Sequence, residues 1–191
     1  MDPVAAKKDL RRDLFSRVKV LTLEQKRTAS QAIVTHLQNA DFFRSAEVVF
    51  SYLSMSSEPE LEPLFENCTD KTWGFSRVNS DETLSFHHLT SLDQTERSSY
   101  GFLEPSPQST ILAPTDAEVI IVPGVGFDKT NGARLGRGKG HYDRFLEPVV
   151  SSPRPPILVG TCFFTQVASL IPESHDIPMN YLVTEQGMVT L

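Results

Sequence analysis

Apolar side chains recur at helical spacing over the N-terminal part of the chain. In residues 4–20 the apolar positions share one face and most of the basic positions lie on the others, which predicts a first amphipathic helix. A second helix is predicted over residues 23–39, where apolar residues again return every three or four positions. Thr22 and Gln25 have the spacing of a capping box at its start. Two helices therefore precede the first strand.

Short apolar runs separated by turn residues predict strands in the rest of the chain. The run AEVIIV, residues 117–122, is continuous rather than alternating and ends at Pro123 and Gly124. This is typical of a strand that is buried on both faces of an α/β sheet. A short helix is expected to start near Pro59, because proline is favoured at the first helical position. Further strands are predicted over residues 46–55, 72–78, 83–89, 157–162 and 181–184, and residues 98–115 form a loop-rich region.

The alternation of helices and strands indicates the fold class. We expect a single-domain open α/β sandwich in which helices flank a central, mostly parallel sheet. With 191 residues, 39% of them hydrophobic, the chain can bury a full core, and one domain over residues 1–191 is expected. The sequence contains no internal repeat and no low-complexity tract.

The segment RLGRGKGHYDRFL, residues 134–146, is the strongest candidate for chemistry. Its glycines lack the Cβ that would keep successive backbone N–H groups from turning toward one anion, and its cations would neutralise that anion. Residues 141–149 predict a short helix whose N-terminus adds partial positive charge. The segment follows the predicted strand 117–122, so it lies where open α/β sheets bind ligands. Its glycines and cations are Gly136, Gly138, Gly140, Arg134, Arg137 and Lys139.

Composition alone explains this segment equally well as a solvated surface loop. The common phosphate motifs do not match it either. A Walker loop needs glycine where Ala133 stands and Ser or Thr where Gly140 stands, and the dinucleotide pattern fails at His141. A nucleotide site here would therefore belong to another class.

Charge and composition narrow the kinds of partner. A net charge of −6 argues against general nucleic-acid binding and favours a small polyanion at the local basic loop. The two cysteines, Cys68 and Cys162, have no spacing typical of a zinc site or a disulfide framework. No signal core and no run of 18 apolar residues is present. We expect a monomeric cytoplasmic protein that binds small molecules and neither nucleic acid nor membrane.

Five ordered motifs resemble the 5-formyltetrahydrofolate cyclo-ligase family, also called methenyltetrahydrofolate synthetase. The strongest is PGVGFDKTNGARLGRGKGHYDRFL, residues 123–146, which follows the family signature almost position by position. The fold implied by the resemblance is that of the broader sugar-phosphate isomerase and coenzyme A transferase-like superfamily. The weaker motifs are KKDLR at 7–11, LSMSSEPEL at 53–61, YGFLEP at 100–105 and HDIPMNYLVTE at 175–185.

The resemblance implies an ATP-dependent ring closure. Enzymes of this family convert 5-formyltetrahydrofolate to 5,10-methenyltetrahydrofolate and consume ATP with Mg²⁺ to give ADP and phosphate. The formyl oxygen is a poor leaving group, so it is first phosphorylated, and N10 of the folate then closes the ring. Positioning and cations around the phosphoryl oxygens are the main demands on such a protein.

The same resemblance implies roles for particular residues. Lys139 and Arg137 are expected nearest the transferring group, and Asp143 is expected to ligate Mg²⁺, directly or through water. Residues expected to bind ATP are Lys7, Arg11, Arg134, Leu135, Gly136, Arg137, Gly138, Lys139, Gly140, His141 and Tyr142. Residues expected to bind the folate are Met55, Glu60, Tyr100, Arg137, Gly138, Lys139, Gly140 and His141.

Other interpretations of these residues stay open. Asp143 could simply stabilise a helix N-terminus, and Lys7 with Arg11 could form a solvated face. Two positions depart from the family: His141 replaces an aromatic residue, and Asn180 stands where an acidic residue is frequent. A non-catalytic nucleotide- or RNA-binding module, or an isomerase or transferase acting on sugar phosphates or coenzyme A esters, is the alternative to the ligase.

Overall fold

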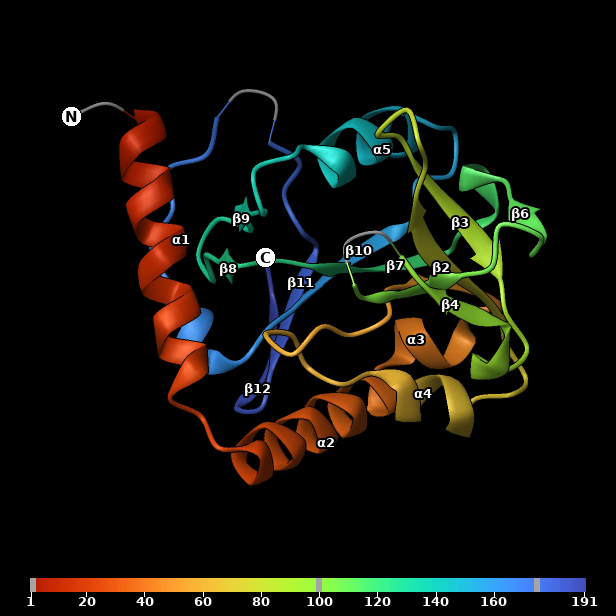
Figure 1. Cartoon of the computed structure of the whole chain (residues 1–191), viewed down its shortest axis with the longest axis horizontal. Helices are drawn as coiled ribbons and strands as arrows, with labels where there is room; N and C mark the ends of the chain where they lie inside the picture. The colour runs from red at the N-terminus through yellow and green to blue at the C-terminus, as the bar shows by residue number, and fades with distance from the viewer. Residues whose placement is uncertain (1–2, 99–100, 174–175) are drawn as a thin grey trace.

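The computed structural model describes residues 3–98, 101–173 and 176–191 (Figure 1). Its helices are α1 (Pro3–Lys19), α2 (Leu23–Asn39), α3 (Asp41–Ser45), α4 (Glu62–Asn67) and α5 (His141–Val150), with 3-10 turns η1 (Leu92–Gln94), η2 (Pro114–Asp116) and η3 (Phe164–Gln166). Its strands are β1 (Val48–Ser51), β2 (Thr72–Val78), β3 (Leu84–His88), β4 (Thr95–Arg97), β5 (Leu103–Pro105), β6 (Ile111–Leu112), β7 (Val119–Pro123), β8 (Gly126–Phe127), β9 (Arg134–Leu135), β10 (Ile157–Thr161), β11 (Tyr181–Thr184) and β12 (Gly187–Thr190).

Eight of these strands form the central sheet, in the order β12-β11-β10-β7-β1-β2-β3-β6. The strands from β11 to β2 pair in parallel, while β12, β3 and β6 add antiparallel pairs at the two edges. The predicted α/β class with a mostly parallel central sheet is confirmed. Two small hairpins, β4-β5 and β8-β9, lie outside the main sheet.

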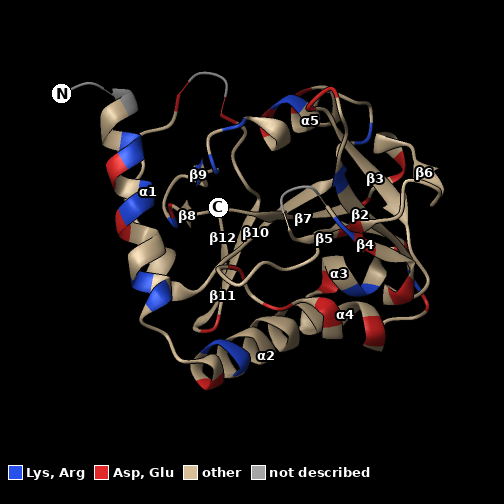
Figure 2. Cartoon of the chain, in the orientation of Figure 1, with Lys and Arg blue, Asp and Glu red and all other residues tan. Residues whose placement is uncertain are grey.

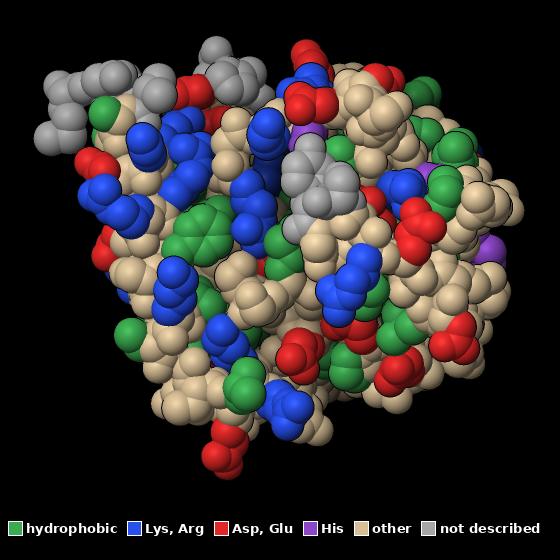
Figure 3. Space-filling model, in the orientation of Figure 1, with side chains coloured by type: hydrophobic (Ala, Val, Ile, Leu, Met, Phe, Trp, Pro, Cys, Tyr) green, Lys and Arg blue, Asp and Glu red, His purple; other side chains and the backbone are tan. Residues whose placement is uncertain are grey.

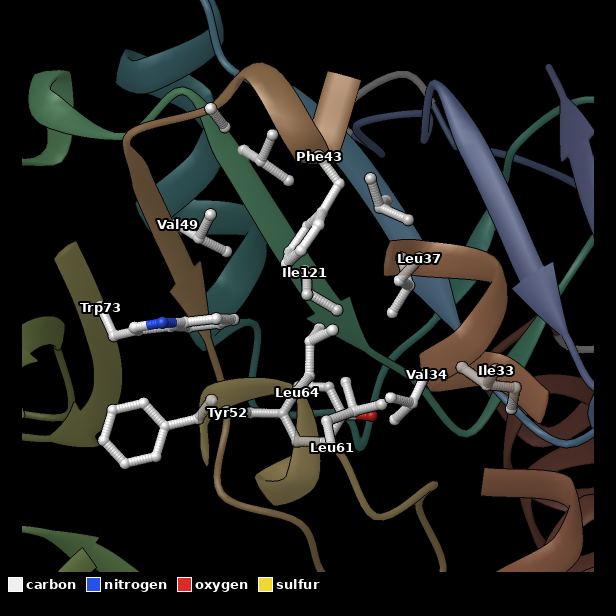
Figure 4. Close-up of a cluster of buried hydrophobic side chains, with 14 of the residues drawn as sticks. Ile33, Val34, Leu37, Phe43, Val49, Tyr52, Leu61, Leu64, Trp73 and Ile121 are labelled. Atoms are coloured by element: carbon white, nitrogen blue, oxygen red, sulfur yellow. The ribbon is translucent and has the colours of Figure 1, made fainter. Parts of the chain in front are cut away.

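The central strand β7 shows why both faces of the sheet are covered. Successive side chains of a strand point to opposite faces, and all four apolar residues of β7 are buried. Val119 and Ile121 pack with side chains of α2, α3 and α4 (Figure 4). Ile120 and Val122 pack with side chains of α5 on the other face. The continuous apolar run of the sequence therefore forms a strand that lies between two hydrophobic clusters, one on each face of the sheet.

Most of the predicted elements are present, some with shorter bounds. The second helix has its predicted ends, and Thr22 and Gln25 form the expected capping box. Strands β2 and β11 also match, whereas the strand predicted over residues 46–55 is limited to β1. Helix α3 and strand β12 were not predicted, because each is too short to show a clear periodicity.

The short helix predicted to start near Pro59 is present, but Pro59 is not its first residue. The chain has no regular secondary structure at Pro59, and its carbonyl accepts a hydrogen bond from the Ser54 hydroxyl at 2.8 Å. Helix α4 begins at Glu62 instead, and Pro63 is the proline in its first turn. Proline does mark a helix start in this region, but the sequence contains two such prolines and the later one is used.

The strand order of the sheet reverses between β1 and β7, although these two strands run parallel. From β1 the sheet is built outward through β2, whereas from β7 it is built in the opposite direction through β10 and β11. The segments that leave the carboxyl ends of β1 and β7 therefore diverge and open a crevice, the usual ligand position in open α/β sheets. The glycine-rich segment follows β7, so its predicted position beyond a strand end is confirmed.

Helix α1 stands beside the sheet and packs on the β8-β9 hairpin and η3 (Figure 1). Leu14 is fully buried in a cluster with Val125 and Leu135. A Cβ on Gly126 would lie 2.5 Å from a methyl carbon of Leu14, so only glycine fits at this point of contact. The helix thereby fixes the base of the segment that carries the basic residues.

Among the described residues, no helix is both long and apolar enough to cross a membrane. The single-domain organisation, the cytoplasmic location and the monomeric state stay predictions.

We predict that Gly160→Ala destabilises the fold by about 1–3 kcal/mol, because an added methyl overpacks a filled core. A Cβ at Gly160 would lie 2.5 Å from a ring carbon of Phe127, which is 1% exposed. Urea unfolding of both proteins measures the difference. The control is Thr190→Ala at an exposed position of β12, expected to change stability by less than about 0.5 kcal/mol. Equal stability of Gly160→Ala and the parent would contradict this packing.

Candidate active site

A cavity of about 270 Å³ lies at the crevice between the carboxyl ends of β1 and β7. Its walls come from the segment after β1, the β2-β3 hairpin, residues 102–104, the end of β7, the glycine-rich loop and the start of α5. The lining residues include Tyr52, Leu53, Met55, Glu58, Ser76, Val78, Leu84, Phe102, Leu103, Glu104, Pro123, Gly124, Arg134, Gly136, Arg137, Lys139, Gly140, His141, Tyr142 and Asp143. Apolar and aromatic groups thus face a basic, glycine-rich wall.

The glycine-rich loop, residues 136–140, has the backbone geometry that the sequence suggested. Gly138 and Gly140 have φ angles of 94° and 68°, in the left-handed region that favours glycine. Gly140 is the N-cap of α5 and offers no side chain to cap the helix. The open N–H groups of the first turn of α5 therefore adjoin the loop and can receive an anion.

Arg134 is the most buried cation of the site. It is 6% exposed at the side chain and donates to the Asp143 carboxylate at 2.6 Å and to the Pro123 carbonyl at 3.3 Å. The guanidinium also lies over the Tyr142 ring, 5.5 Å from its centre. Its buried Nε atom has no hydrogen-bond partner among the described residues. This arginine therefore links the loop to α5 and keeps one donor for a ligand.

Arg137 bridges the loop to the segment after β1. Its Nη2 group donates to Glu58 at 2.8 Å and to the Ser57 hydroxyl at 2.9 Å. The guanidinium lies over the Phe15 ring of α1, 5.3 Å from its centre. The side chain is 39% exposed, so solvent and ligands can still reach it.

Lys139 is the most exposed cation of the loop, at 62% of its side chain. It pairs with Glu82 at the tip of the β2-β3 hairpin at 3.6 Å, and both side chains are largely exposed. Such a pair contributes little because water screens it. Arg144 adds hydrogen bonds to the carbonyls of Lys139 and Glu82, at 2.9 and 3.1 Å. The lysine is thus free to exchange its partner for a phosphate.

The two basic residues predicted on α1 are placed differently. Arg11 donates from Nε to the Gly136 carbonyl at 2.8 Å and lies against Gly138. Lys7 instead pairs with Glu173 at 3.0 Å and does not line the cavity. Figure 3 shows that Lys and Arg side chains gather on the part of this face occupied by α1 and the glycine-rich loop. Figure 2 shows that acidic residues are frequent on and around α3 and α4. The protein is acidic overall, but its basic side chains are concentrated on this part of the surface.

His141 and Tyr142, the first two residues of α5, both line the cavity. Burial lowers the pKa of His141, and the nearby Arg144 cation lowers it further. Its buried Nε2 atom has no hydrogen-bond partner among the described residues. Burial raises the pKa of Tyr142 well above its ordinary value, although the Ser76 hydroxyl opposes this. Both rings are therefore neutral near pH 7.

Several residues expected at the site lie elsewhere. Leu135 is buried beneath α1, where it contributes to the core and not to the cavity wall. Glu60 is exposed and outside the wall, with its backbone N–H bonded to the Ser30 hydroxyl. Asn180 accepts from the Leu158 backbone at 2.7 Å, so its oxygen stabilises the sheet. Tyr100 lies outside the described residues.

Two buried carboxylates on the wall were not predicted. Glu58 and Glu104 are 5% and 3% exposed, and both line the cavity. Glu104 accepts from the Val78 backbone at 3.2 Å and lies 3.9 Å from Arg77. Glu58 belongs to a motif noted in the sequence, but an irregular loop has no period that tells which of two nearby acids points inward.

The side chains that line the cavity do not form a site that could hold a metal ion without a bound substrate. No group of three His, Cys, Asp or Glu residues able to hold one occurs within the described ranges. Asp143 lies on the wall with a side chain 31% exposed, and one of its oxygens already accepts from Arg134. Mg²⁺ is often held by only one or two carboxylates together with substrate phosphates. The residues present therefore fit a magnesium ion that arrives with a nucleotide.

The fold and the cavity define an α/β protein with a glycine-rich, basic loop at the switch point of a mostly parallel sheet. Comparison with known proteins narrows this class. The chain belongs to the 5-formyltetrahydrofolate cyclo-ligase family, whose model matches residues 3–185.

Individual relatives agree with this assignment. A solved Aquifex aeolicus 5,10-methenyltetrahydrofolate synthetase superposes with a TM-score of 0.83 at 30% identity, over 97% of this chain and 92% of that chain. A mouse 5-formyltetrahydrofolate cyclo-ligase is 27% identical over 96% of this chain and 95% of its own length. A Saccharomyces cerevisiae protein of the same name is 40% identical over a segment that covers 56% of this chain and 53% of that protein.

We predict that the imidazole of His141 titrates with a midpoint below its ordinary value of 6.5, since burial and Arg144 both disfavour the charged form. Histidine NMR signals followed against pH measure it. The chain has five histidines, and the signal that disappears in His141→Phe identifies this one. A midpoint above 6.5 would show that a carboxylate, such as that of Glu82, outweighs these two effects.

Proposed function

We propose that the protein catalyses the ATP-dependent closure of 5-formyltetrahydrofolate to 5,10-methenyltetrahydrofolate, with release of ADP and phosphate. One observation carries this proposal: a glycine-rich loop with exposed cations and an apolar, aromatic surface are walls of the same cavity. A phosphate and a flat ring can therefore meet there. Membership of the cyclo-ligase family supports the same reaction.

The size of the cavity suggests which parts of the substrates it holds. Ligand pockets usually measure about 300–1,000 Å³, and this one measures about 270 Å³. It can enclose the reacting ends of two molecules, a phosphoryl group and a formylated ring, but not both molecules entirely. The remaining parts would lie across the basic face next to α1, where Arg11 and Lys7 are placed.

The reaction has two steps, a phosphoryl transfer and a ring closure, and negative charge develops on the phosphoryl oxygens in the first. The formyl oxygen attacks the γ-phosphorus, the bond to the bridging oxygen breaks, and ADP leaves. N10 of the folate then attacks the activated carbon and loses its proton, and the carbon–oxygen bond breaks to release phosphate. Arg137 and Lys139 stand on the wall where they would offset negative charge on the transferring group. A magnesium ion bound with the nucleotide would offset more of that charge, with Asp143 as its protein ligand.

The apolar part of the cavity suits the folate ring. Met55 contributes soft, adaptable surface, and Tyr142 contributes an aromatic ring. The amino-pyrimidinone edge of the folate presents hydrogen-bond donors, and the buried Glu104 carboxylate is an acceptor on the wall. Glu60 stays a predicted ligand, although it lies at an exposed position outside this wall.

We predict an ATP-dependent rise in methenyl-folate absorbance when the protein is mixed with 5-formyltetrahydrofolate and Mg²⁺. The control omits ATP, and folding is checked by circular dichroism. A folded protein that binds ATP without any rise would contradict the ligase and favour a nucleotide-binding module. An isomerase or transferase acting on sugar phosphates or coenzyme A esters would show no ATP turnover.

We predict that Lys139→Ala lowers kcat by about 10²–10³-fold, the usual cost of removing one preorganised charge-stabilising group. Thermal unfolding should be nearly unchanged, because this side chain is 62% exposed and its ion pair is weak. The matched control is Lys129→Ala, an exposed lysine in the β8-β9 hairpin, which should keep normal turnover. Near-normal activity in folded Lys139→Ala would falsify the assigned role.

A further inference from the structure

Arg144, in the first turn of α5, joins two walls of the cavity from outside. Its Nη1 group donates to the Lys139 carbonyl at 2.9 Å, and its Nη2 group donates to the Glu82 carbonyl at 3.1 Å. Lys139 belongs to the glycine-rich loop, and Glu82 lies at the tip of the β2-β3 hairpin. Arg144 itself is exposed and does not line the cavity. It therefore acts on the site through the residues that it holds.

The bond to Lys139 fixes the direction of one peptide unit of the glycine-rich loop. A trans peptide is planar, so its carbonyl and its N–H point in opposite directions. Because the Lys139 carbonyl is turned toward Arg144, the N–H of Gly140 is turned away from it. No residue that the structure describes accepts a hydrogen bond from this N–H. Gly140 lines the cavity, so this donor is available to a ligand there.

Gly140 is the residue that lets Arg144 reach this carbonyl. An added Cβ at Gly140 would lie 2.9 Å from Nη1 of Arg144, so the guanidinium occupies the space that a side chain would fill. The carbonyl of Gly140 also accepts from the backbone N–H of Arg144 at 3.1 Å. The arginine is thus tied to the end of the loop by both its backbone and its side chain.

The hairpin tip gives the guanidinium a fixed base. The backbone N–H of Asn79 donates to the Thr83 carbonyl at 2.9 Å, and that of Glu82 donates to the Asn79 carbonyl at 3.0 Å. The Asp81 carboxylate accepts from the backbone N–H and the hydroxyl of Thr83, at 3.0 and 2.6 Å. These bonds define the turn that presents the Glu82 carbonyl. Since an arginine fork is planar, holding one corner on this turn directs the other corner.

We propose that Arg144 is a positioning residue: it holds the Lys139 carbonyl on the outer side of the loop and so directs the N–H of Gly140 toward the transferring phosphoryl group. The inference rests on the proposed function and adds a residue that touches neither substrate. A donor oriented before the reaction needs no reorganisation, so it stabilises the transition state more than one that must first turn.

The first test is the kinetics of Arg144→Ala. Its kcat should fall about ten- to hundredfold with little change in the KM for the folate, because a misdirected donor weakens the transition state most. Thermal unfolding should be nearly unchanged, since the side chain is exposed. The matched control is Arg154→Ala, an exposed arginine in the loop after α5, which should keep normal kcat.

Arg144→Lys separates geometry from charge. Lysine keeps the positive charge but lacks the planar fork that reaches two carbonyls, so its kcat should stay close to that of Arg144→Ala. Full recovery of kcat with lysine would show that charge alone suffices and would overturn the positioning role. Normal kcat in folded Arg144→Ala, or a loss confined to the KM for the folate, would overturn it as well.

A second measurement observes the peptide directly. Gly140 is the only glycine that follows a lysine, so protein labelled with carbonyl-13C lysine and 15N glycine gives one NMR signal from the Lys139–Gly140 peptide. A non-hydrolysable ATP analogue added with Mg²⁺ should shift this signal in wild-type protein, and shift it less in Arg144→Ala at saturation. No shift in saturated wild type, or equal shifts in the two proteins, would refute the proposed orientation. The wild-type arm applies even where Arg144→Ala does not fold.

Wild-type cyclisation is measured before the variants, so that the two proposals are tested separately. A folded wild type that binds ATP without cyclisation contradicts the proposed function. The amide signal of Gly140 then still tests the positioning role, because it requires binding and no turnover. A wild type that binds no nucleotide contradicts both proposals.

Discussion

The site depends on neutralising positive charge that is concentrated on a short, flexible loop. Arg134, Arg137 and Lys139 lie close together in the sequence and would repel one another on a segment that glycines leave free to move. Each has a carboxylate partner, and the three partners come from α5, the segment after β1 and the β2-β3 hairpin. Attraction to α5 and to the segment after β1 therefore gives the loop a defined shape, whereas the exposed Lys139–Glu82 pair adds little.

The sheet brings these attachments within reach of the loop. Its strands β1 and β7 are neighbours in space, and the segments leaving them diverge because the chain continues to opposite sides. The cavity opens at this divergence, with the Glu58 segment on one wall and the glycine-rich loop on another. The continuous apolar run of β7 packs against helices on both faces of the sheet, so the walls are attached to a rigid base.

Much of this could be predicted from the sequence where a local pattern determines the outcome. The continuous apolar run of β7, the capping box of α2 and the glycine spacing each have a short-range physical cause, and the structure contains all three. The inward position of Glu58 could not be predicted in this way. It depends on a cation some eighty positions away, which no periodicity in an irregular loop reveals.

The choice between two prolines as a helix start shows the same limit, since Pro59 is held by a contact with Ser54 that only the folded chain creates. Lys7 and Arg11 lie one turn apart on α1, yet only Arg11 contacts the glycine-rich loop. The sequence predicts that these two side chains share one face of the helix. It does not predict which neighbouring segment each of them contacts.

Helix α1 has a consequence for how the protein is made. Arg11 bonds to a carbonyl 125 positions later, and the helix packs on η3 and on the β8-β9 hairpin, which are synthesised long after it. During translation the helix emerges early, with its apolar stripe uncovered, and must wait for its packing partners. Contacts of such long range are slow to form. The glycine-rich loop therefore acquires its final shape late, after most of the sheet has left the ribosome.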